Sequence, residues 1–217
     1  MTDAITEVAP DVYDLTLEAG DARYRAFLVD GDAPTLVDCG FDRTTDALAD
    51  RLSALGVTPE RLVVTHVHPD HTGGYDAVVD RYAPTTYVPA ESDHDFAHAP
   101  DHRYGHGDTV GPFEAVHVPG HTGDNYALVD ESRDVAVMGD AAIGADWRGL
   151  PAGYFVLVEG IYSNDLRAAE RNLERLQAYD FDVGLVFHGS HVRGDAREKL
   201  DAFLDFPGKP DEWPDGD

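Results

Sequence analysis

The chain has 217 residues, 42% of them apolar, with 42 acidic residues against 16 basic ones and a net charge of −26. This length and apolar content allow an ordinary hydrophobic core and exclude intrinsic disorder. The scarcity of lysine and arginine argues against nucleic acid as a partner, because phosphate binding depends on clustered basic side chains. Acidic residues dispersed along the whole chain are typical of a solvated surface and of halophilic proteins, where salt screens the repulsion.

Targeting and redox features favour the cytoplasm. No apolar run is long enough to cross a bilayer, and the N-terminus lacks a basic stretch followed by an apolar run. The single cysteine, Cys39, cannot form a disulfide within the chain, which suits a reducing compartment. We therefore expect a cytoplasmic protein without a membrane partner. A homodimer is left open.

The first half of the chain predicts short strands and two helices. Runs rich in β-branched and aromatic residues, bounded by glycine and aspartate, predict the strands. Apolar residues at helical spacing predict the helices. The predicted strands are Val12–Leu17, Tyr24–Val29, Thr35–Asp38, Leu62–Thr65 and Thr86–Val88, and the helices are Thr44–Leu55 and a segment from Gly73-Gly74 to about Tyr82.

The second half repeats this organisation. Strands are predicted at Glu114–Val118, Tyr126–Val129, Val135–Met138 and Val183–Phe187, a helix capped by Ser163-Asn164 carries Leu166, Ala169, Leu173 and Leu176 on its inner face, and a last helix covers Ala196–Leu204. Two such sets suit a four-layer αββα sandwich of two mixed β-sheets flanked by helices. We expect residues 1–206 to form a single domain and the Pro-rich, acidic residues 207–217 to form a loose tail.

The densest group of potential ligands is the segment His66–His71, which reads His-Val-His-Pro-Asp-His. Alternate side chains of an extended segment point to one side, so His66, His68 and Asp70 can converge, while His71 is out of phase until the chain turns. Zinc, iron and manganese accept imidazole and carboxylate ligands. Four candidate ligands in six residues, directly after a buried strand, predict a metal site.

Three further candidate ligands, His121, Asp140 and His188, each follow a predicted strand. Strand ends are positions from which a rigid scaffold can direct side chains into a common cleft. His191, three residues beyond His188, is an alternative for the last ligand.

The order of these residues resembles the metallo-beta-lactamase superfamily, with its HxHxDH motif at His66–His71. The resemblance extends from about Val12 to Leu204 and implies the αββα fold. It also implies that Asp38 supports a ligand without binding metal itself. The implied ligands are His66, His68 and His121 for one ion, Asp70, His71 and His188 for a second, and Asp140 as the bridge.

The implied cofactors are two divalent ions, with zinc expected and iron or manganese as alternatives. Two such ions lower the pKa of a water towards neutrality and polarise a carbonyl. Asp70 is expected to orient the water and pass on its proton. The predicted activity is that of a metallo-hydrolase acting on a thioester, lactone or similar activated ester of a small molecule.

Departures from known branches of the superfamily bear on the substrate. Zinc β-lactamases commonly have a cysteine in place of Asp140, and quorum-quenching lactonases have a tyrosine in place of Ile143. Glyoxalase II-like hydroxyacylglutathione hydrolases share all seven ligand types, but they continue with a helical substrate-binding segment, whereas 29 of the 217 residues follow His188 here. The alternatives are a mononuclear iron dioxygenase of the persulfide dioxygenase type and a non-catalytic member of the fold.

The irregular segment Ala141–Tyr162 is expected to form the substrate wall, through Trp147, Arg148, Tyr154 and Tyr162. Arg148 is the candidate for receiving a substrate carboxylate. The alternative is that these aromatic residues pack in the core or against a second subunit. A series of histidines is expected in solvated loops, with a role at the substrate rim as the alternative: His94, His98, His102 and His106.

Overall fold

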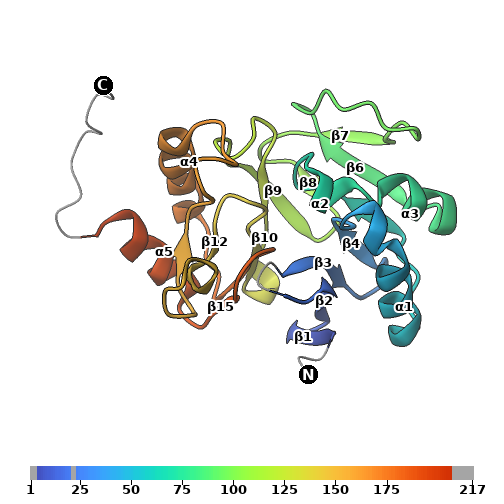
Figure 1. Ribbon diagram of the computed structural model, residues 1–217, viewed down its shortest axis with the longest axis horizontal. Helices are drawn as coiled ribbons and strands as arrows, with labels where there is room; N and C mark the ends of the chain where they lie inside the picture. Colours follow the sequence, from blue (N-terminus) through green and yellow to red (C-terminus); the bar gives the residue numbers. More distant parts are fainter. Residues whose placement is uncertain (1–3, 21–22, 207–217) are drawn as a thin grey trace.

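The computed structural model describes residues 4–20 and 23–206 (Figure 1), so the tail expected at residues 207–217 lies outside the described residues. The first half of the chain forms a seven-stranded sheet with its strands in sequence order. Strands β1 to β4 pair antiparallel and β4 to β7 pair parallel. The strands are β1 (Ile5–Ala9), β2 (Val12–Glu18), β3 (Tyr24–Val29), β4 (Thr35–Val37), β5 (Arg61–Val63), β6 (Thr85–Pro89) and β7 (His102–Tyr104).

The second half forms a six-stranded sheet in the order β15-β14-β11-β10-β9-β8. Its one parallel pair is β11 with β14, and the other pairs are antiparallel. The strands are β8 (Thr109–Val110), β9 (Phe113–His117), β10 (Tyr126–Asp130), β11 (Val135–Val137), β14 (Val183–Leu185) and β15 (Val192–Arg193). A separate two-stranded ribbon, β12 (Ile143–Gly144) and β13 (Phe155–Val156), lies within the segment that showed no sequence period.

Helices cover the outer faces of both sheets. Figure 1 shows α1 (Thr45–Leu55) and α3 (Tyr75–Tyr82) on one side, and α4 (Leu166–Leu173) and α5 (Ala196–Leu204) on the other. The one-turn helix α2 (Pro69–Thr72) lies between these layers, and short 3₁₀ turns occur at Asp42–Thr44, Glu131–Arg133, Ala145–Arg148 and Glu174–Ala178. The predicted four-layer αββα sandwich is confirmed. None of the helices in the described ranges combines the length and apolar character needed to cross a membrane.

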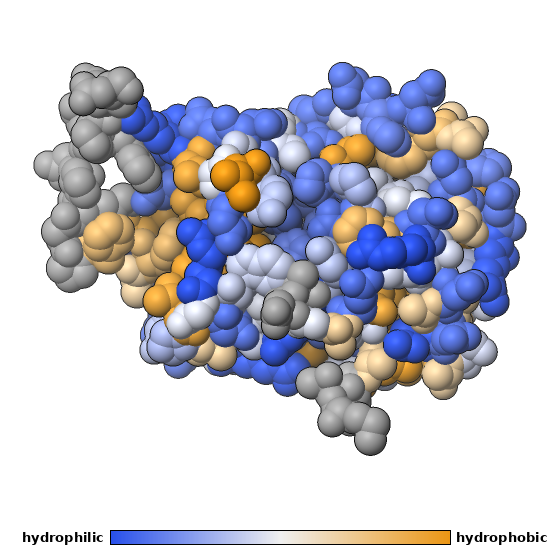
Figure 2. Space-filling view, in the orientation of Figure 1, coloured by the Kyte–Doolittle hydropathy of each residue, from blue (hydrophilic) through white to orange (hydrophobic). Residues whose placement is uncertain are grey.

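Alternation along the strands explains the three layers of core. In β3, Phe27 and Val29 face the second sheet, while Ala26 and Leu28 pack with residues of α1 and α3. Successive side chains of a strand point to opposite faces, so a strand covered on both faces is apolar throughout. A third cluster joins the second sheet to α4 and α5. The outer surface is mostly hydrophilic, with small separate apolar patches on the face in Figure 2, in keeping with the acidic composition.

The predicted cap of the fourth helix is wrong by a residue or two. The N-cap is Asp165, whose side chain accepts a hydrogen bond from the Ala168 N–H at 2.9 Å. The preceding residues remain tied to another segment, because Asn164 N donates to His121 O and Asp165 N donates to Gly120 O. These tertiary hydrogen bonds therefore shift the start of the helix to a later residue than predicted.

Candidate metal centre

The segment after β5 delivers four potential ligands through one change of backbone direction. His68 is still extended, with φ −143° and ψ 147°, and Pro69 occupies the first turn of α2. Proline is well suited to this position because the first helical N–H groups lack partners within the helix. The single turn of α2 then brings His71 back towards His66, and their ring centroids lie 4.1 Å apart.

The remaining ligands come from loops beyond three strands of the second sheet: β9 for His121, β11 for Asp140 and β14 for His188. The side chains form three overlapping groups in which the potential ligand atoms all lie within 4.8 Å of one another. These groups are His66, His68 and His121; His66, His71 and Asp140; and Asp70, His71 and His188. Residues far apart in sequence therefore meet at one edge of the sandwich.

Asp140 lies at the centre of the cluster. Its Oδ1 is 3.5 Å from His71 Nε2, and its Oδ2 is 3.5 Å from His121 Nε2 and 3.6 Å from His188 Nε2. Asp70 Oδ2 is 3.3 Å from His188 Nε2. The carboxylate of Asp140 thus faces both groups of histidines, which is the position a bridging ligand requires.

The chemistry of the cluster fits metal ions. Buried polar atoms normally have a hydrogen-bond partner, and an unsatisfied one costs about 1–3 kcal/mol. Several atoms of the cluster are buried without such a partner: Nε2 of His66, His71 and His121, and Oδ1 of Asp140. Imidazole nitrogens and carboxylate oxygens are the donors that zinc, iron and manganese accept. A cation would satisfy these atoms together.

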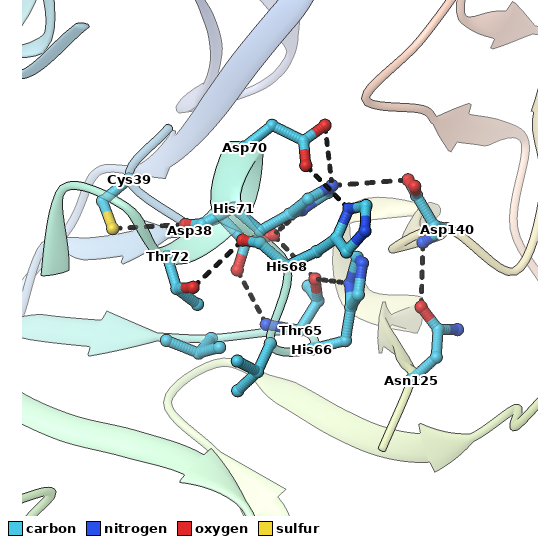
Figure 3. A network of polar contacts seen from close by, with 12 residues as sticks. Asp38, Cys39, Thr65, His66, His68, Asp70, His71, Thr72, Asn125 and Asp140 are labelled. Carbon is cyan, nitrogen blue, oxygen red and sulfur yellow. Dashed lines mark hydrogen bonds and ion pairs between the residues drawn. The ribbon is translucent and has the colours of Figure 1, made fainter. Parts of the chain in front are cut away.

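Asp38 fixes the orientation of His71 (Figure 3). Its Oδ1 accepts from Thr65 N at 2.7 Å, and its Oδ2 accepts from Thr65 Oγ at 2.6 Å and lies 2.7 Å from His71 Nδ1. With Nδ1 occupied, His71 presents Nε2 to the cluster. Cys39 is fully buried, as expected of a small core residue, and its Sγ donates to His71 O at 3.2 Å.

Electrostatics within the cluster reflect its carboxylates. Burial alone would lower the pKa of His188, but the negative charge of Asp140 and the contact with Asp70 raise it to about 9. Burial lowers the pKa of His66, which is fully enclosed. The site therefore combines a histidine that burial holds in its neutral form, His66, with one whose positive charge the aspartates favour, His188.

A cavity of about 360 Å³ opens beside the cluster. Trp147 and Tyr162, two of the residues expected to form a substrate wall, line this cavity together with Tyr24, Phe41, Ile143, Val158 and Glu159. Arg148 and Tyr154 are not in its lining. Arg148 Nη1 donates to Leu157 O at 3.3 Å and lies 3.5 Å from Glu159 Oε1, and the Tyr154 ring lies 5.9 Å from Lys199 Nζ. The structure thus gives no support to Arg148 as the receptor of a substrate carboxylate.

The family model of the metallo-beta-lactamase superfamily matches residues 24–183. The chain belongs to the metallo-beta-lactamase superfamily. It is similar to a hydroxyacylglutathione hydrolase of Xylella fastidiosa, with 33% identity over 39% of this chain and 33% of the relative. The corresponding protein of Chromohalobacter salexigens is 35% identical over 50% of this chain and 38% of the relative. The matches thus span less than half the length of these curated relatives.

Solved structures of the superfamily share the fold. The metallo-beta-lactamase DIM-1 aligns with a TM-score of 0.73 and 18% identity, covering 92% of this chain and 94% of that one. A beta-lactamase domain protein from Burkholderia ambifaria aligns with a TM-score of 0.67 and 23% identity over 92% of this chain and 74% of that one. At such identities the similarity concerns the fold alone.

Within this superfamily fold, His188 rather than His191 joins the ligand cluster. His191 is nearly buried on the far side of its loop, where Nε2 lies 2.9 Å from Asp14 Oδ2 and Nδ1 accepts from Val186 N at 3.2 Å. Both ring nitrogens are thus engaged away from the other ligands.

Sequence reasoning missed the arginine that holds this loop. Arg25, on β3, donates from Nε to Asp14 Oδ2 at 2.9 Å. Its Nη1 donates to the carbonyls of Val186 and Phe187 at 3.1 and 2.9 Å, and its Nη2 donates to Gly189 O at 2.7 Å. These carbonyls flank His188 in sequence. Arg25 is the one charged residue in an otherwise apolar and aromatic predicted strand, and nothing in the local sequence indicates its role.

Asn125 is a second missed residue. Its Oδ1 accepts from Asp140 N at 3.0 Å (Figure 3), and its Nδ2 donates to Val118 O at 3.1 Å. It thereby ties the backbone of Asp140 to the end of the strand that leads to His121. In the sequence Gly123-Asp-Asn125 indicates only a turn.

The histidine series outside the cluster belongs to none of the ligand groups formed by the described residues. His94 and His106 are exposed outside regular elements, as predicted, and His98 Nε2 pairs with Asp80 at 2.9 Å. His102 departs from the loop prediction because it lies in β7, where it stacks on Tyr87 with centroids 4.8 Å apart.

Gly120, directly before His121, allows close packing against α4. A Cβ atom at this position would lie 2.2 Å from both Cα and N of Ala169, and the backbone has φ +150°. We expect Gly120→Ala to lower the free energy of unfolding by about 1–3 kcal/mol, because the helix must move away. Urea denaturation checks this, with Gly123→Ala as control, where a Cβ meets no atom within 4 Å. Equal stability of the two variants would contradict it.

Proposed function

We propose that this protein is a metal-dependent hydrolase that activates water at a dinuclear site and attacks a thioester, lactone or similarly activated ester. The observation that carries the proposal is the convergence of buried histidine nitrogens and an aspartate oxygen that lack hydrogen-bond partners beside an open cavity. Such a donor set is costly unless it binds cations.

The ligand groups suggest how two ions would be held. His66, His68 and His121 would bind the first ion, Asp70, His71 and His188 the second, and Asp140 both. Zinc is the expected metal, with iron and manganese as alternatives. When bound, two divalent ions supply Lewis acidity that lowers the pKa of water and polarises a carbonyl oxygen.

Asp70 is the proposed proton carrier. Its carboxylate borders the cavity, with Oδ1 2.9 Å from His68 Nδ1 and Oδ2 3.3 Å from His188 Nε2. These contacts hold both carboxylate oxygens in place, so the group can orient the attacking water. It would then transfer the proton of that water to the departing sulfur or oxygen.

The relatives support hydrolysis of an acyl–sulfur bond as one branch of the proposal. Two of them carry the name hydroxyacylglutathione hydrolase, although each match covers at most half of this chain. The lactone branch rests on the same chemistry, since both substrates present an activated carbonyl to an activated water.

The test combines metal content with activity. Protein purified without added metal is analysed for metal identity and stoichiometry, and chromogenic thioesters, lactones, phosphodiesters and β-lactams are then assayed with defined metals at molar salt. We expect two ions per chain and a loss of roughly a hundredfold or more in kcat/KM for Asp140→Asn. Asp50→Asn, an exposed aspartate of α1, is the matched control.

Two outcomes would contradict the proposal. Activity that survives exhaustive chelation would remove the metal from the reaction. One iron per chain with oxygen consumption on a persulfide would instead support the dioxygenase alternative.

A further inference from the structure

We propose that the cavity beside the metal centre selects an uncharged acyl group bearing an aromatic or branched alkyl side chain, and rejects substrates whose acyl group carries a carboxylate. This inference rests on the proposed hydrolase function, because it names the class of substrate for the same site. It follows from the apolar wall of the cavity and from the pairing of the arginines around it.

Aromatic rings stand on two sides of His188. The Tyr24 ring is 5.6 Å from the His188 ring and packs edge-on against Phe41, with centroids 4.8 Å apart. Trp147 lies 5.3 Å from His188. Tyr24 belongs to β3, Phe41 follows β4, and Trp147 belongs to the segment after Asp140. An acyl group in the cavity therefore lies against rings from both halves of the chain.

The rest of the wall is also mainly apolar, since Ile143 and Val158 are buried against the cavity and Tyr162 lines it. A volume of about 360 Å³ is at the lower end of the range for small-molecule sites, roughly 300–1,000 Å³. Rings and branched alkyl groups gain free energy when they leave water for such surroundings. A phenylacetyl-sized group has suitable size and polarity.

The charged groups of the cavity argue against an anionic acyl group. Among the described residues that line the cavity none is a lysine or arginine, and Glu159 adds a carboxylate. Trp147 Nε1 donates to Glu159 Oε1 at 3.1 Å, which fixes that carboxylate against the aromatic wall.

Three arginines near the cavity already have acidic partners. Arg43 Nη2 is 3.1 Å from Glu18 Oε2, Arg148 Nη1 is 3.5 Å from Glu159 Oε1, and Arg23 Nη1 is 3.9 Å from Asp146 Oδ2. A substrate carboxylate would have to compete with these partners. Away from the metal ligands the lining offers no cationic side chain, so a carboxylate enclosed at the far end of the acyl group would lack a counter-ion, which is costly.

The catalytic experiment compares two thioesters with one leaving group: S-phenylacetyl-N-acetylcysteamine and its para-carboxy analogue. We expect kcat/KM to be roughly tenfold or more higher for the neutral thioester. The assay is repeated at molar salt, where the Debye length is about 3 Å, because this screens long-range repulsion by the acidic surface but not local exclusion. Equal use of both thioesters at molar salt would overturn the proposal.

A binding experiment separates this inference from the proposed function. 1-Phenylbutan-2-one and its para-carboxy analogue carry the same acyl groups as the two thioesters but cannot be hydrolysed. Their binding is followed by Trp147 fluorescence, with Trp147→Phe assigning the signal. We expect the neutral ketone to bind roughly tenfold or more tightly. If the neutral ketone binds selectively but the protein hydrolyses neither thioester, the proposed hydrolase function is contradicted and the selectivity of the cavity is retained. Equal binding, or binding of neither ketone, would overturn the selectivity itself.

A charge variant tests the source of selectivity. Glu159→Gln keeps an oxygen that can accept from Trp147 and releases Arg148 from its acidic partner. We expect the preference for the neutral thioester to fall severalfold. Glu60→Gln removes the same charge at an exposed position after α1 and is expected to leave the preference unchanged. If the preference falls equally in both variants, overall charge rather than the cavity sets the selectivity. If it is unchanged in both, Glu159 is not a source of the selectivity.

Discussion

Replacement of Arg25 by methionine is expected to lower the free energy of unfolding by about 3–5 kcal/mol, the range for breaking a buried ion pair by removing one partner. Arg25 and Asp14 are both buried, and the guanidinium also satisfies three backbone carbonyls next to His188. Methionine fills similar space but removes the positive charge beside Asp14, which keeps its contacts with Thr16 and His191, and deprives the three carbonyls of the arginine donor. Chemical denaturation of the metal-free protein measures the loss.

The control for this variant is Arg103→Met. Arg103 also donates to backbone carbonyls, those of Pro89 and Ser92 at 3.2 and 2.7 Å, but it is exposed. Water can replace its hydrogen bonds, so we expect a loss below about 1 kcal/mol. Equal losses in the two variants would contradict the special role of burial.

The effect of Arg25→Met depends on pH through Asp14. Burial alone would raise the pKa of Asp14, but the hydrogen bond from His191 and the charge of Arg25 lower it. A carboxyl group with a lowered pKa in the fold stabilises the protein above its ordinary pKa of about 4 and loses this contribution as the pH falls below it. The stability difference between wild type and variant is therefore expected to shrink in acid. A difference that grew there would count against the ion pair as its cause.

Asp38→Asn is expected to weaken metal binding by roughly 10–100-fold, the range for loss of a group that orients a ligand. In the wild type, Asp38 Oδ2 accepts from Thr65 and faces His71 Nδ1 at 2.7 Å. An amide NH₂ in that place favours the tautomer of His71 with its proton on Nε2, the atom that faces the cluster. The backbone is preserved, because asparagine tolerates the left-handed φ of 56° at this position.

Competition with a chromogenic chelator gives the metal affinity of this variant, and thermal unfolding of the metal-free protein checks its fold. Asp101→Asn is the matched control, because Asp101 Oδ2 accepts from the N and Oγ of Thr86 in the same manner, far from the cluster in an exposed segment. We expect the control to keep the wild-type affinity. Unchanged affinity in Asp38→Asn would remove it from the support of the site.

Local pattern was sufficient to predict the layers of the fold. Strands such as β3 and β10 are apolar on both faces because each sheet is covered on both sides, and α1 ends at Gly56, which takes a left-handed conformation. Short pairings without an apolar period, β12 with β13 and β15 with β14, were not predicted. Their pairing depends on neighbours that local sequence does not reveal.

The candidate ligands could also be recognised in the sequence, since histidine and aspartate at strand ends have few competing explanations, and the structure brings these residues together. The residues that hold these candidate ligands in position were not predicted, apart from Asp38. Arg25 and Asn125 act through backbone atoms of segments far away in the sequence. Arg148 was predicted to receive a substrate carboxylate because nothing in the sequence related it to Glu159, the partner that lies eleven residues further on.

The order of the ligands along the chain has a consequence for biosynthesis. The group of His66, His68 and His121 precedes β10, whereas the group of Asp70, His71 and His188 needs a residue beyond β14. Arg25 leaves the ribosome early but finds its carbonyl acceptors only when that late loop is made. The residues of the first candidate group are thus all synthesised early, whereas the group that contains His188 is complete only when nearly the whole polypeptide has emerged.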